Sequence, residues 1–478
     1  MKNILAFDVG TTAMKCILFD EYFNEIFSIN KEYCIQTDKS GMAELDAERY
    51  YESFCECIDK MEKSSIDAIC FTTQGETLIP VDEEGKALSK AIVWLDTRAE
   101  EEASFIKNNI KEEEIYSATG LCDIDGALPL AKVLWLKKNK PEIYEKTEKF
   151  LLLEDYLIFR LTGKKVSEKS LQSSTGWYDI VNETLFEDAI NICGIDRKKI
   201  PEIVPCGSIV GTISKDISEE LGLSPSTIVV AGAMDQISSA IGAGNIEEGI
   251  LTETTGTALV VGVTVKKPEF DLKKPVTVYK HYDNKFMYMP YSATAGIVLK
   301  WFRDTVMPDV IREAEEKAIS SYKLIDTIAE KAPAGSNGVI MNPDFTNGGG
   351  FCGLTLATTR ADLARSVLEG VSYMLKGLIE PIEMRGARID KILSLGGGSY
   401  SKLWGEIKAS VCEKEIECVK YGETTALGAA VLAAVAIGIY KSVGEALQNI
   451  KNSGNNYKPN PENQAIYRNC YLKYKGYI

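Results

Sequence analysis

Short apolar stretches separated by polar turns open the chain. The first spans residues 4–8, and residues 15–19 and 25–35 follow, with a glycine–threonine turn at residues 10–12 between the first two. Closely spaced apolar stretches joined by turn residues are typical of antiparallel strands. We therefore expect the chain to begin with a three-stranded meander.

A helical periodicity comes next. It predicts a helix over residues 47–63 with Asp46 as its N-cap, and then a short buried strand at residues 66–71. The other elements expected in this half are a mostly helical region, a buried strand and a helix of small residues, at residues 99–200, 227–231 and 236–244.

The opening pattern returns faintly in the second half. Residues 251–257 lead through another glycine–threonine turn into residues 258–265, about 245 positions after the first copy. We place a domain boundary near Asn245, which predicts domains at residues 1–245 and 246–478. Two helices, a strand that ends in glycines and a strongly apolar helix are expected at residues 295–304, 360–384, 391–395 and 426–439.

Composition fits this division. The chain has 478 residues, of which 45% are hydrophobic and 26% charged, so it is long enough for two globular cores. The net charge of −15 argues against nucleic acid as a partner, because phosphate binding needs a basic surface. The first residues lack the pattern of a signal peptide, and the longest apolar run is too short to cross a bilayer. We expect a cytoplasmic protein without a membrane partner.

Cysteine and histidine usage limits the chemistry. Twelve cysteines in a chain without a secretory signal are expected to be reduced core residues rather than disulfides or a zinc site. His281 is the single histidine, and its neighbours are typical of a strand end. Most histidine-based catalysis is therefore excluded.

The first turn carries candidate phosphate chemistry. Asp8 ends a strand, Gly10, Thr11 and Thr12 form a tight turn rich in donors, and Lys15 lies on the next strand. Such a turn can hold phosphate oxygens, and Asp8 can hold Mg²⁺ through water. A hairpin with ordinary turn chemistry is the alternative.

Three further features favour a polyphosphate ligand. Gly256 and Thr257 repeat the first turn, and two such turns facing each other would clamp phosphates from both sides. Gly397 and Gly398 follow a strand, where glycines allow close approach of a flat ligand or a phosphate. Asp235 lies between a buried strand and a helix, which is a common place for active-site residues, although an N-cap role is the alternative.

These motifs resemble the FGGY family of carbohydrate kinases over essentially the whole chain. The most specific stretch joins residues 349–354 to residues 362–369, and residues 129–136 resemble the family's other signature with a departure at Ala127. Residues 155–163 and 396–404 are similar to xylulokinase-like members. The resemblance implies an α/β fold with two actin-like (ribonuclease H-like) ATPase domains flanking an interdomain cleft.

The resemblance also implies site residues, ATP as the phosphoryl donor and Mg²⁺. Asp235 is expected to be the general base, with Asp8 and Asp235 at the metal. Gln74, Glu76, Asp235 and Gln236 are expected to bind the sugar or polyol. The nucleotide and its phosphates are assigned to Gly10, Thr11, Thr12, Lys15, Gly256, Thr257, Gly296, Lys300, Gly397 and Gly398.

The sugar loop, residues 74–77, departs from the patterns of the two best-known kinds of kinase in the family. Glycerol kinases carry an arginine at Gly75, and xylulokinases carry a methionine–histidine pair at Gly75 and Glu76. Glycine is expected to leave extra volume for a larger polyol. A ketopentose such as xylulose is favoured, while glycerol, tetritols, ribulose and a deoxyhexulose stay open.

Closure about a hinge at residues 245–248 is expected to exclude water, and relatives suggest a homodimer.

Two other classes compete with a kinase. An actin-like or Hsp70-like ATPase would share the paired turns but lack the sugar loop at residues 74–77. A catalytically inactive sugar-binding regulator would not need Asp8, Asp235 and Thr257. An ATPase assay with and without a panel of polyols separates these classes.

Overall fold

The computed structural model describes residues 2–61, 65–419, 422–450 and 454–477. Residues 1–246, 266–287 and 423–451 form one compact unit, and residues 247–265, 288–422 and 452–478 form the other. We call them unit 1 and unit 2. The two units interleave along the chain, so the contiguous domains at residues 1–245 and 246–478 stay a prediction.

A six-stranded sheet forms the centre of unit 1, in the order β14-β15-β6-β1-β2-β3. The expected meander is confirmed, because β1 pairs with β2 and β2 with β3 in antiparallel fashion. β6 runs parallel to both β1 and β15, which places the carboxyl ends of these three strands at the same edge of the sheet. The strands span Asn3–Val9 (β1), Ala13–Asp20 (β2), Glu25–Glu32 (β3), Ala68–Thr73 (β6), Ile209–Thr212 (β14) and Ile228–Met234 (β15).

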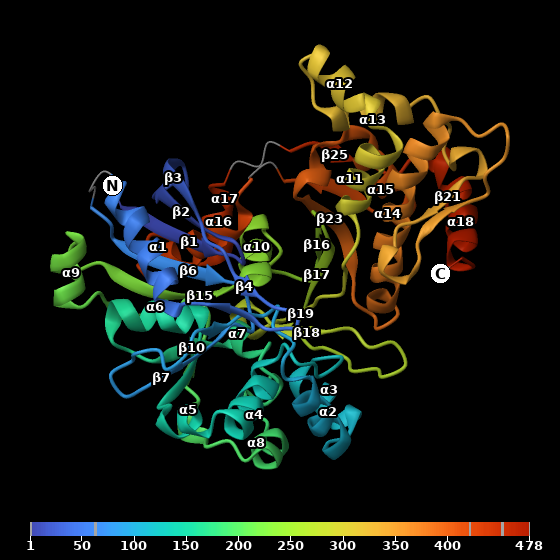
Figure 1. Cartoon of the computed structure of the whole chain (residues 1–478). Helices are drawn as coiled ribbons and strands as arrows, with labels where there is room; N and C mark the ends of the chain where they lie inside the picture. The colour runs from blue at the N-terminus through green and yellow to red at the C-terminus, as the bar shows by residue number, and fades with distance from the viewer. Residues whose placement is uncertain (1, 62–64, 420–421, 451–453, 478) are drawn as a thin grey trace. The chain divides into compact units, whose positions relative to one another are not determined.

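Helices cover both faces of this sheet, with α6 (Leu153–Thr162) on one side and α16 (Thr424–Ala436) on the other (Figure 1). Asp46 caps α1 (Ala47–Asp59) as expected, by accepting from the Glu48 N–H, although the helix ends four residues before its predicted limit. Phe54 of α1 packs in the core 5.7 Å from Phe71, measured between ring centroids. Truncating such a buried ring to alanine typically costs about 3–5 kcal/mol.

Two glycines let α16 approach α10 (Asp235–Ala243) closely. A Cβ atom at Gly242 would lie 2.0 Å from the Thr424 carbonyl oxygen, and one at Gly428 would lie 1.9 Å from that of Ser238. The Ser238 hydroxyl also donates to the Thr425 carbonyl at 2.8 Å. The helix that begins with Asp235 is therefore held by backbone-to-backbone contact with a segment far away in the chain.

A second sheet of unit 1 has the order β4-β5-β8-β7-β9. The predicted helical region is largely confirmed, with short strands interspersed. The strands are Gln36–Thr37 (β4), Ala43–Leu45 (β5), Leu78–Val81 (β7), Ala91–Ile92 (β8) and Lys149–Leu152 (β9). The helices are Glu100–Asn109 (α2), Glu112–Thr119 (α3), Pro129–Asn139 (α4), Pro141–Lys146 (α5), Lys169–Gln172 (α7), Glu187–Cys193 (α8) and Lys215–Leu221 (α9).

Unit 2 repeats the central arrangement. In its sheet, β16 (Gly249–Thr255) pairs antiparallel with β17 (Leu259–Val265) and parallel with β23 (Ile389–Leu395). Next come β24 (Glu415–Cys418), parallel, and β25 (Asn456–Tyr457), antiparallel. The strand–turn–strand predicted from residues 251–265 is thus confirmed.

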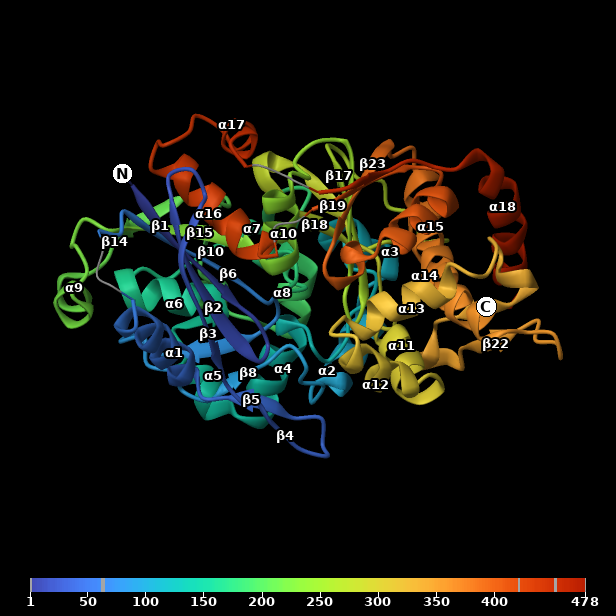
Figure 2. The ribbon, with the colours of Figure 1, turned by 90° about the horizontal axis from the view of Figure 1, so that it is seen from above.

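Helices pack on the sheet of unit 2. Figure 2 shows α15 (Lys402–Cys412) beside α14 (Arg360–Glu383), with α18 (Pro461–Lys475) at the end of the chain. A capping box begins α14, in which Thr359 and Asp362 each bond the other's backbone N–H. The predicted helix at residues 295–304 is divided into α11 (Gly296–Trp301) and a wider turn at Phe302–Val306. Within the described parts of the chain, no helix has the length and hydropathy needed to cross a membrane.

Candidate active site

The first glycine–threonine turn joins β1 to β2. Gly10 donates its N–H to the Ala13 carbonyl at 2.9 Å, and the Tyr33 hydroxyl donates to the Gly10 carbonyl at 2.5 Å. The register places Asp8 directly opposite Lys15 on the neighbouring strand. The structure therefore brings together the carboxylate, the turn and the lysine that the sequence singles out in this region.

Negative charge is concentrated around Asp8. Burial, together with the charges of Asp235 and Glu423, raises the pKa of this carboxyl to about 7, while Lys15 opposes the shift. Lys15 forms an ion pair with Glu423, which precedes α16. Because like charges that are out of water repel strongly, this group of carboxylates favours a cation or a proton as its partner.

Gln74 connects the first turn to the sugar loop. Its Oε1 atom accepts from the Thr11 hydroxyl at 2.8 Å, and its amide Nε2 donates to the Thr77 hydroxyl at 3.1 Å. Trp94 donates its indole N–H to the same Thr11 hydroxyl at 2.9 Å. The Gln74 side chain is thus already engaged on both ends, which makes it a bracing group for the loop.

Glu76 sits in the loop with a left-handed backbone, at φ of 60°. Burial raises the pKa of its carboxyl, as do the charges of Asp125 and Asp235, whereas Lys132 lowers it. Burial also disfavours the charged form of Lys132 and so lowers its pKa. Its amino group donates to the backbone carbonyls of Glu76 and Val93, each at 2.9 Å. Lys132 therefore clamps the sugar loop to the segment that contains Trp94.

The extra volume expected at Gly75 is absent. A Cβ atom there would lie 3.0 Å from Ser174 Oγ and 3.3 Å from Met234 Sδ. The expectation was wrong because side chains from two other segments already fill the space beside the glycine.

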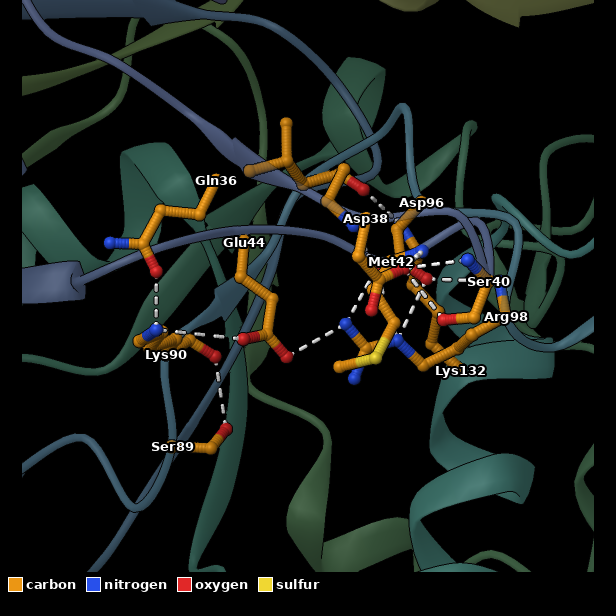
Figure 3. A network of polar contacts seen from close by, with 12 residues as sticks. Gln36, Asp38, Ser40, Met42, Glu44, Ser89, Lys90, Asp96, Arg98 and Lys132 are labelled. Atoms are coloured by element: carbon orange, nitrogen blue, oxygen red, sulfur yellow. Dashed lines mark hydrogen bonds and ion pairs between the residues drawn. The ribbon is translucent and has the colours of Figure 1, made fainter.

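Asp96, which follows Trp94, belongs to a buried structural network rather than to an open site (Figure 3). Its carboxylate accepts from the Arg98 guanidinium through several short contacts and from the Ala43 N–H at 2.6 Å. Arg98 also donates to Glu44 at 2.8 Å. Such a bidentate pair fixes the loop that carries Trp94.

Asp235 is the first residue of α10 and directly follows β15. Its Oδ1 atom accepts from the Gln236 N–H at 2.6 Å, and burial raises the pKa of the carboxyl to about 6. The N-cap position belongs to Met234, so Asp235 does not serve as the helix cap. Its charge acts on both Asp8 and Glu76, which groups the three carboxyls in one region of unit 1.

The second turn, in unit 2, borders a pocket of about 970 Å³. Gly296 begins α11 so close to the turn that a Cβ atom would lie 2.1 Å from the Gly256 carbonyl oxygen. Ala295 donates its N–H to the Thr257 carbonyl at 3.0 Å. The pocket wall includes Gly256, Thr257, Gly296, Lys300, Gly397 and Gly398, which are the nucleotide residues expected in this half of the chain.

Some residues of the two regions were not expected from the sequence. Asp125 and Lys132 face Glu76, and Glu423 faces Asp8. In the pocket, Asp326 has a pKa raised to about 6 by burial. Lys132 lies inside the motif at residues 129–136, so a lysine on the apolar face of a helix was an available signal. Lys300 pairs with Asp304 at 2.9 Å, which reduces its freedom to meet a phosphate.

Two α/β units, each with a glycine–threonine turn after its first strand, define a two-domain sugar kinase fold. The family model of the N-terminal domain of the FGGY family of carbohydrate kinases matches residues 3–242, and the model of the family's C-terminal domain matches residues 251–437. The chain therefore belongs to the FGGY family of carbohydrate kinases, which transfer phosphate from ATP to a sugar hydroxyl.

Relatives with different substrates match at similar identity. The chain is 28% identical to a gluconokinase of Bacillus subtilis, over 97% of this chain and 93% of the relative. It is also 28% identical to a xylulose kinase of Staphylococcus epidermidis, over 99% and 96%. Among solved structures, xylulose kinase from Lactobacillus acidophilus gives a TM-score of 0.91 at 26% identity, covering 100% of this chain and 97% of that one.

Proposed function

We propose that this kinase phosphorylates a hydroxyl of a small neutral sugar or polyol, with a ketopentose such as xylulose favoured and Asp235 as the general base. The observation that carries the proposal is the half-buried group of carboxyls formed by Asp8, Glu76 and Asp235, near the end of β1, in the sugar loop and directly after β15, whose charges act on one another. Glycerol, tetritols, ribulose and a deoxyhexulose are the other acceptors that this arrangement allows.

Asp235 suits the role of base because its pKa, raised to about 6, still leaves it ionised near neutral pH. In phosphoryl transfer the proton of the acceptor hydroxyl leaves late, so the base mainly orients that hydroxyl. Glu76 supplies a second carboxyl that accepts from sugar hydroxyls. We propose the same contact role for Gln236, while Gln74 braces the loop through Thr11 and Thr77.

The carboxylates fit Mg²⁺. This ion usually takes one or two carboxylates together with waters and phosphate oxygens. Asp8 carries a pKa raised by burial and by neighbouring Asp235 and Glu423, and a divalent cation would relieve that repulsion. We assign the metal to Asp8 and Asp235; when bound, it would offset negative charge on the phosphates.

For the nucleotide we propose the pocket of unit 2, which the second turn borders. The N–H and hydroxyl of Thr257 would meet phosphate oxygens at one end of the pocket, with the open side of Gly256 beside them. Gly397 and Gly398 form the wall against which the base and ribose would lie, with the ring of Trp404 nearby. Gly10, Thr11, Thr12 and Lys15 would hold phosphate from unit 1.

Charge favours a neutral acceptor over an acid such as gluconate. Glu76 is surrounded by Asp125 and Asp235, and the ammonium of Lys132 is occupied by two backbone carbonyls. A substrate carboxylate would be repelled here, whereas hydroxyl groups can donate to the carboxylates.

A phosphorylation screen with ATP and Mg²⁺ tests this proposal. We expect xylulose or another neutral ketose to be turned over with a kcat/KM at least about tenfold above that of gluconate. A preference for gluconate would overturn the proposed acceptor class, and ATP hydrolysis that no polyol accelerates would overturn the proposal as a whole.

A cytoplasmic location, which the sequence pattern led us to expect, and a homodimer, which the family resemblance suggests, are also proposed. Sedimentation of the purified chain would test the second: a monomer at micromolar concentration would contradict it.

A further inference from the structure

The strand that leads to Asp235 contains an extra residue. In the pairing of β15 with β6, Val230 lies opposite Cys70 but Ala233 lies opposite Thr72, so three steps along β15 match two along β6. A β-bulge of this kind bends a strand and redirects the side chains that follow. Gly232 is needed at the bulge, because a Cβ atom there would lie 1.8 Å from the Phe71 carbonyl oxygen.

Buried side chains take up the N–H groups that flank this bulge. Glu154, in the first turn of α6, accepts the Gly232 N–H on Oε1 at 2.6 Å. Ser170 of α7 accepts the Met234 N–H on its hydroxyl oxygen at 2.9 Å. The Ser170 hydroxyl in turn donates to Glu168 at 2.7 Å. The residue directly after Met234 is Asp235.

We propose that Glu154, together with the Ser170–Glu168 pair, forms a positioning device that holds the β15 bulge and thereby aims Asp235 at the acceptor hydroxyl. This inference rests on the proposed role of Asp235. These residues would not touch substrate, and they act only through the backbone of residues 232–234.

Helix capping alone does not account for Glu154. Glu168 caps α7 by accepting the Ser170 and Leu171 N–H groups, but Glu154 bonds a strand outside its own helix. Its second oxygen, Oε2, is buried without a hydrogen-bond partner among the described residues. Placing a carboxyl in such surroundings costs stability, so its presence is better explained by the backbone that it holds than by a gain in stability.

The chemistry of the pair predicts which substitution is tolerated. Burial raises the pKa of Glu154, and the neighbouring Glu168 raises it further, which favours the neutral acid at position 154. A glutamine has the same shape and keeps a carbonyl oxygen for the Gly232 N–H. Leucine has similar bulk but leaves that N–H without an acceptor.

Steady-state kinetics of Glu154→Gln and Glu154→Leu, with xylulose or the best acceptor of the screen, test the device. We expect Glu154→Leu to lower kcat by between about tenfold and a hundredfold with the KM for ATP unchanged, since misplacing a catalytic group is costly. Glu154→Gln should stay within about threefold of the wild type.

Asp155→Leu is the matched control. This neighbour is equally buried and accepts the Leu152 N–H at 2.8 Å. The change therefore damages the same helix start but leaves Glu154 in place as the acceptor for β15. It should lower the melting temperature about as much as Glu154→Leu while leaving the kcat of the folded enzyme near normal. Equal losses of kcat in both variants would overturn the inference.

A double-mutant cycle separates this inference from the proposed function. If Glu154 acts through Asp235, then Glu154→Leu should have no further effect on kcat in the Asp235→Asn background, whereas independent losses would multiply. A nearly inactive Asp235→Asn beside a fully active Glu154→Leu would overturn the positioning role alone. A fully active Asp235→Asn would overturn the proposed function itself. Should Glu154→Leu fail to fold, Ser170→Ala removes the Met234 N–H acceptor, and a normal kcat in that variant would be equally contradictory.

Discussion

The two glycine–threonine turns share a backbone plan and differ in charge. Each follows the first strand of a sheet, and each turn glycine donates its N–H back across the bend, Gly10 to Ala13 and Gly256 to Ala258. The second turn is one residue shorter, because Val9 pairs with Met14 but Thr255 pairs with Leu259. The same plan thus holds two different chemical surroundings.

The charged side chains beside the first turn, Asp8 and Lys15, are partly exposed, whereas those beside the second turn are buried. Asp8 stands two residues before Gly10, whereas Thr254 stands two residues before Gly256. The acid of the second unit, Glu253, is fully buried and paired with Lys408 at 2.5 Å, and Lys408 also donates to the Thr255 hydroxyl at 3.0 Å. The difference teaches that one turn plan can hold a partly exposed acid, which favours a cation, or an acid neutralised by a buried lysine.

Asp8→Asn makes the first turn resemble the second in charge and should have the largest effect. We expect kcat/KM to fall by about 10²–10³-fold, because charge stabilisation at the phosphates is lost. Kinetics across a Mg²⁺ titration check this, with the exposed Asp38→Asn as control. Full activity at saturating Mg²⁺ would remove Asp8 from the metal site.

Lys408→Met tests the buried pair beneath the second turn. It should lower the free energy of unfolding by about 3 kcal/mol, because Glu253 would stay buried and uncompensated. Lys15→Met breaks the half-exposed pair with Glu423 and should cost less than about 1 kcal/mol. Urea unfolding of both variants measures the difference, and equal costs would contradict the contrast between the turns.

Gly256→Ala tests ligand approach without a fold defect. An added Cβ meets nothing within 4 Å in the protein, so stability should be unchanged or slightly higher. If phosphate lies against this glycine, the KM for ATP should still rise by about tenfold or more. Gly350→Ala, equally open and in the same unit, serves as control. Unchanged ATP affinity would place the phosphates elsewhere.

Asp235→Asn should have a small effect on stability that depends on pH. The folded pKa of about 6 lies above the ordinary value of 3.8, so the folded protein binds the extra proton between these values. The cost of the charge is therefore absent below pH 4 and complete above pH 6. The variant should be more stable than the wild type by about 1 kcal/mol at pH 8 and by less at pH 4. Thermal unfolding at both values checks the sign, and a gain only in acid would contradict it.

Local patterns predicted much of this molecule. The β1–β2–β3 meander, the Asp46 cap and the place of Asp235 at the start of a helix all depend on neighbouring residues, and the structure has them. Contacts between distant segments were not readable. Tertiary packing decides that Lys132 of α4 contacts the sugar loop and that Glu154 of α6 contacts β15. It also decides that the side chains of Ser174 and Met234 lie beside Gly75.

The turnover of Asp235→Asn, measured beside its affinity for ATP, tests the central claim most directly. The account predicts that kcat falls by about 10²–10⁴-fold, the usual contribution of a general base, while the Kd for ATP stays within about threefold of the wild type. A folded variant that turns over its sugar at nearly the normal rate would contradict it.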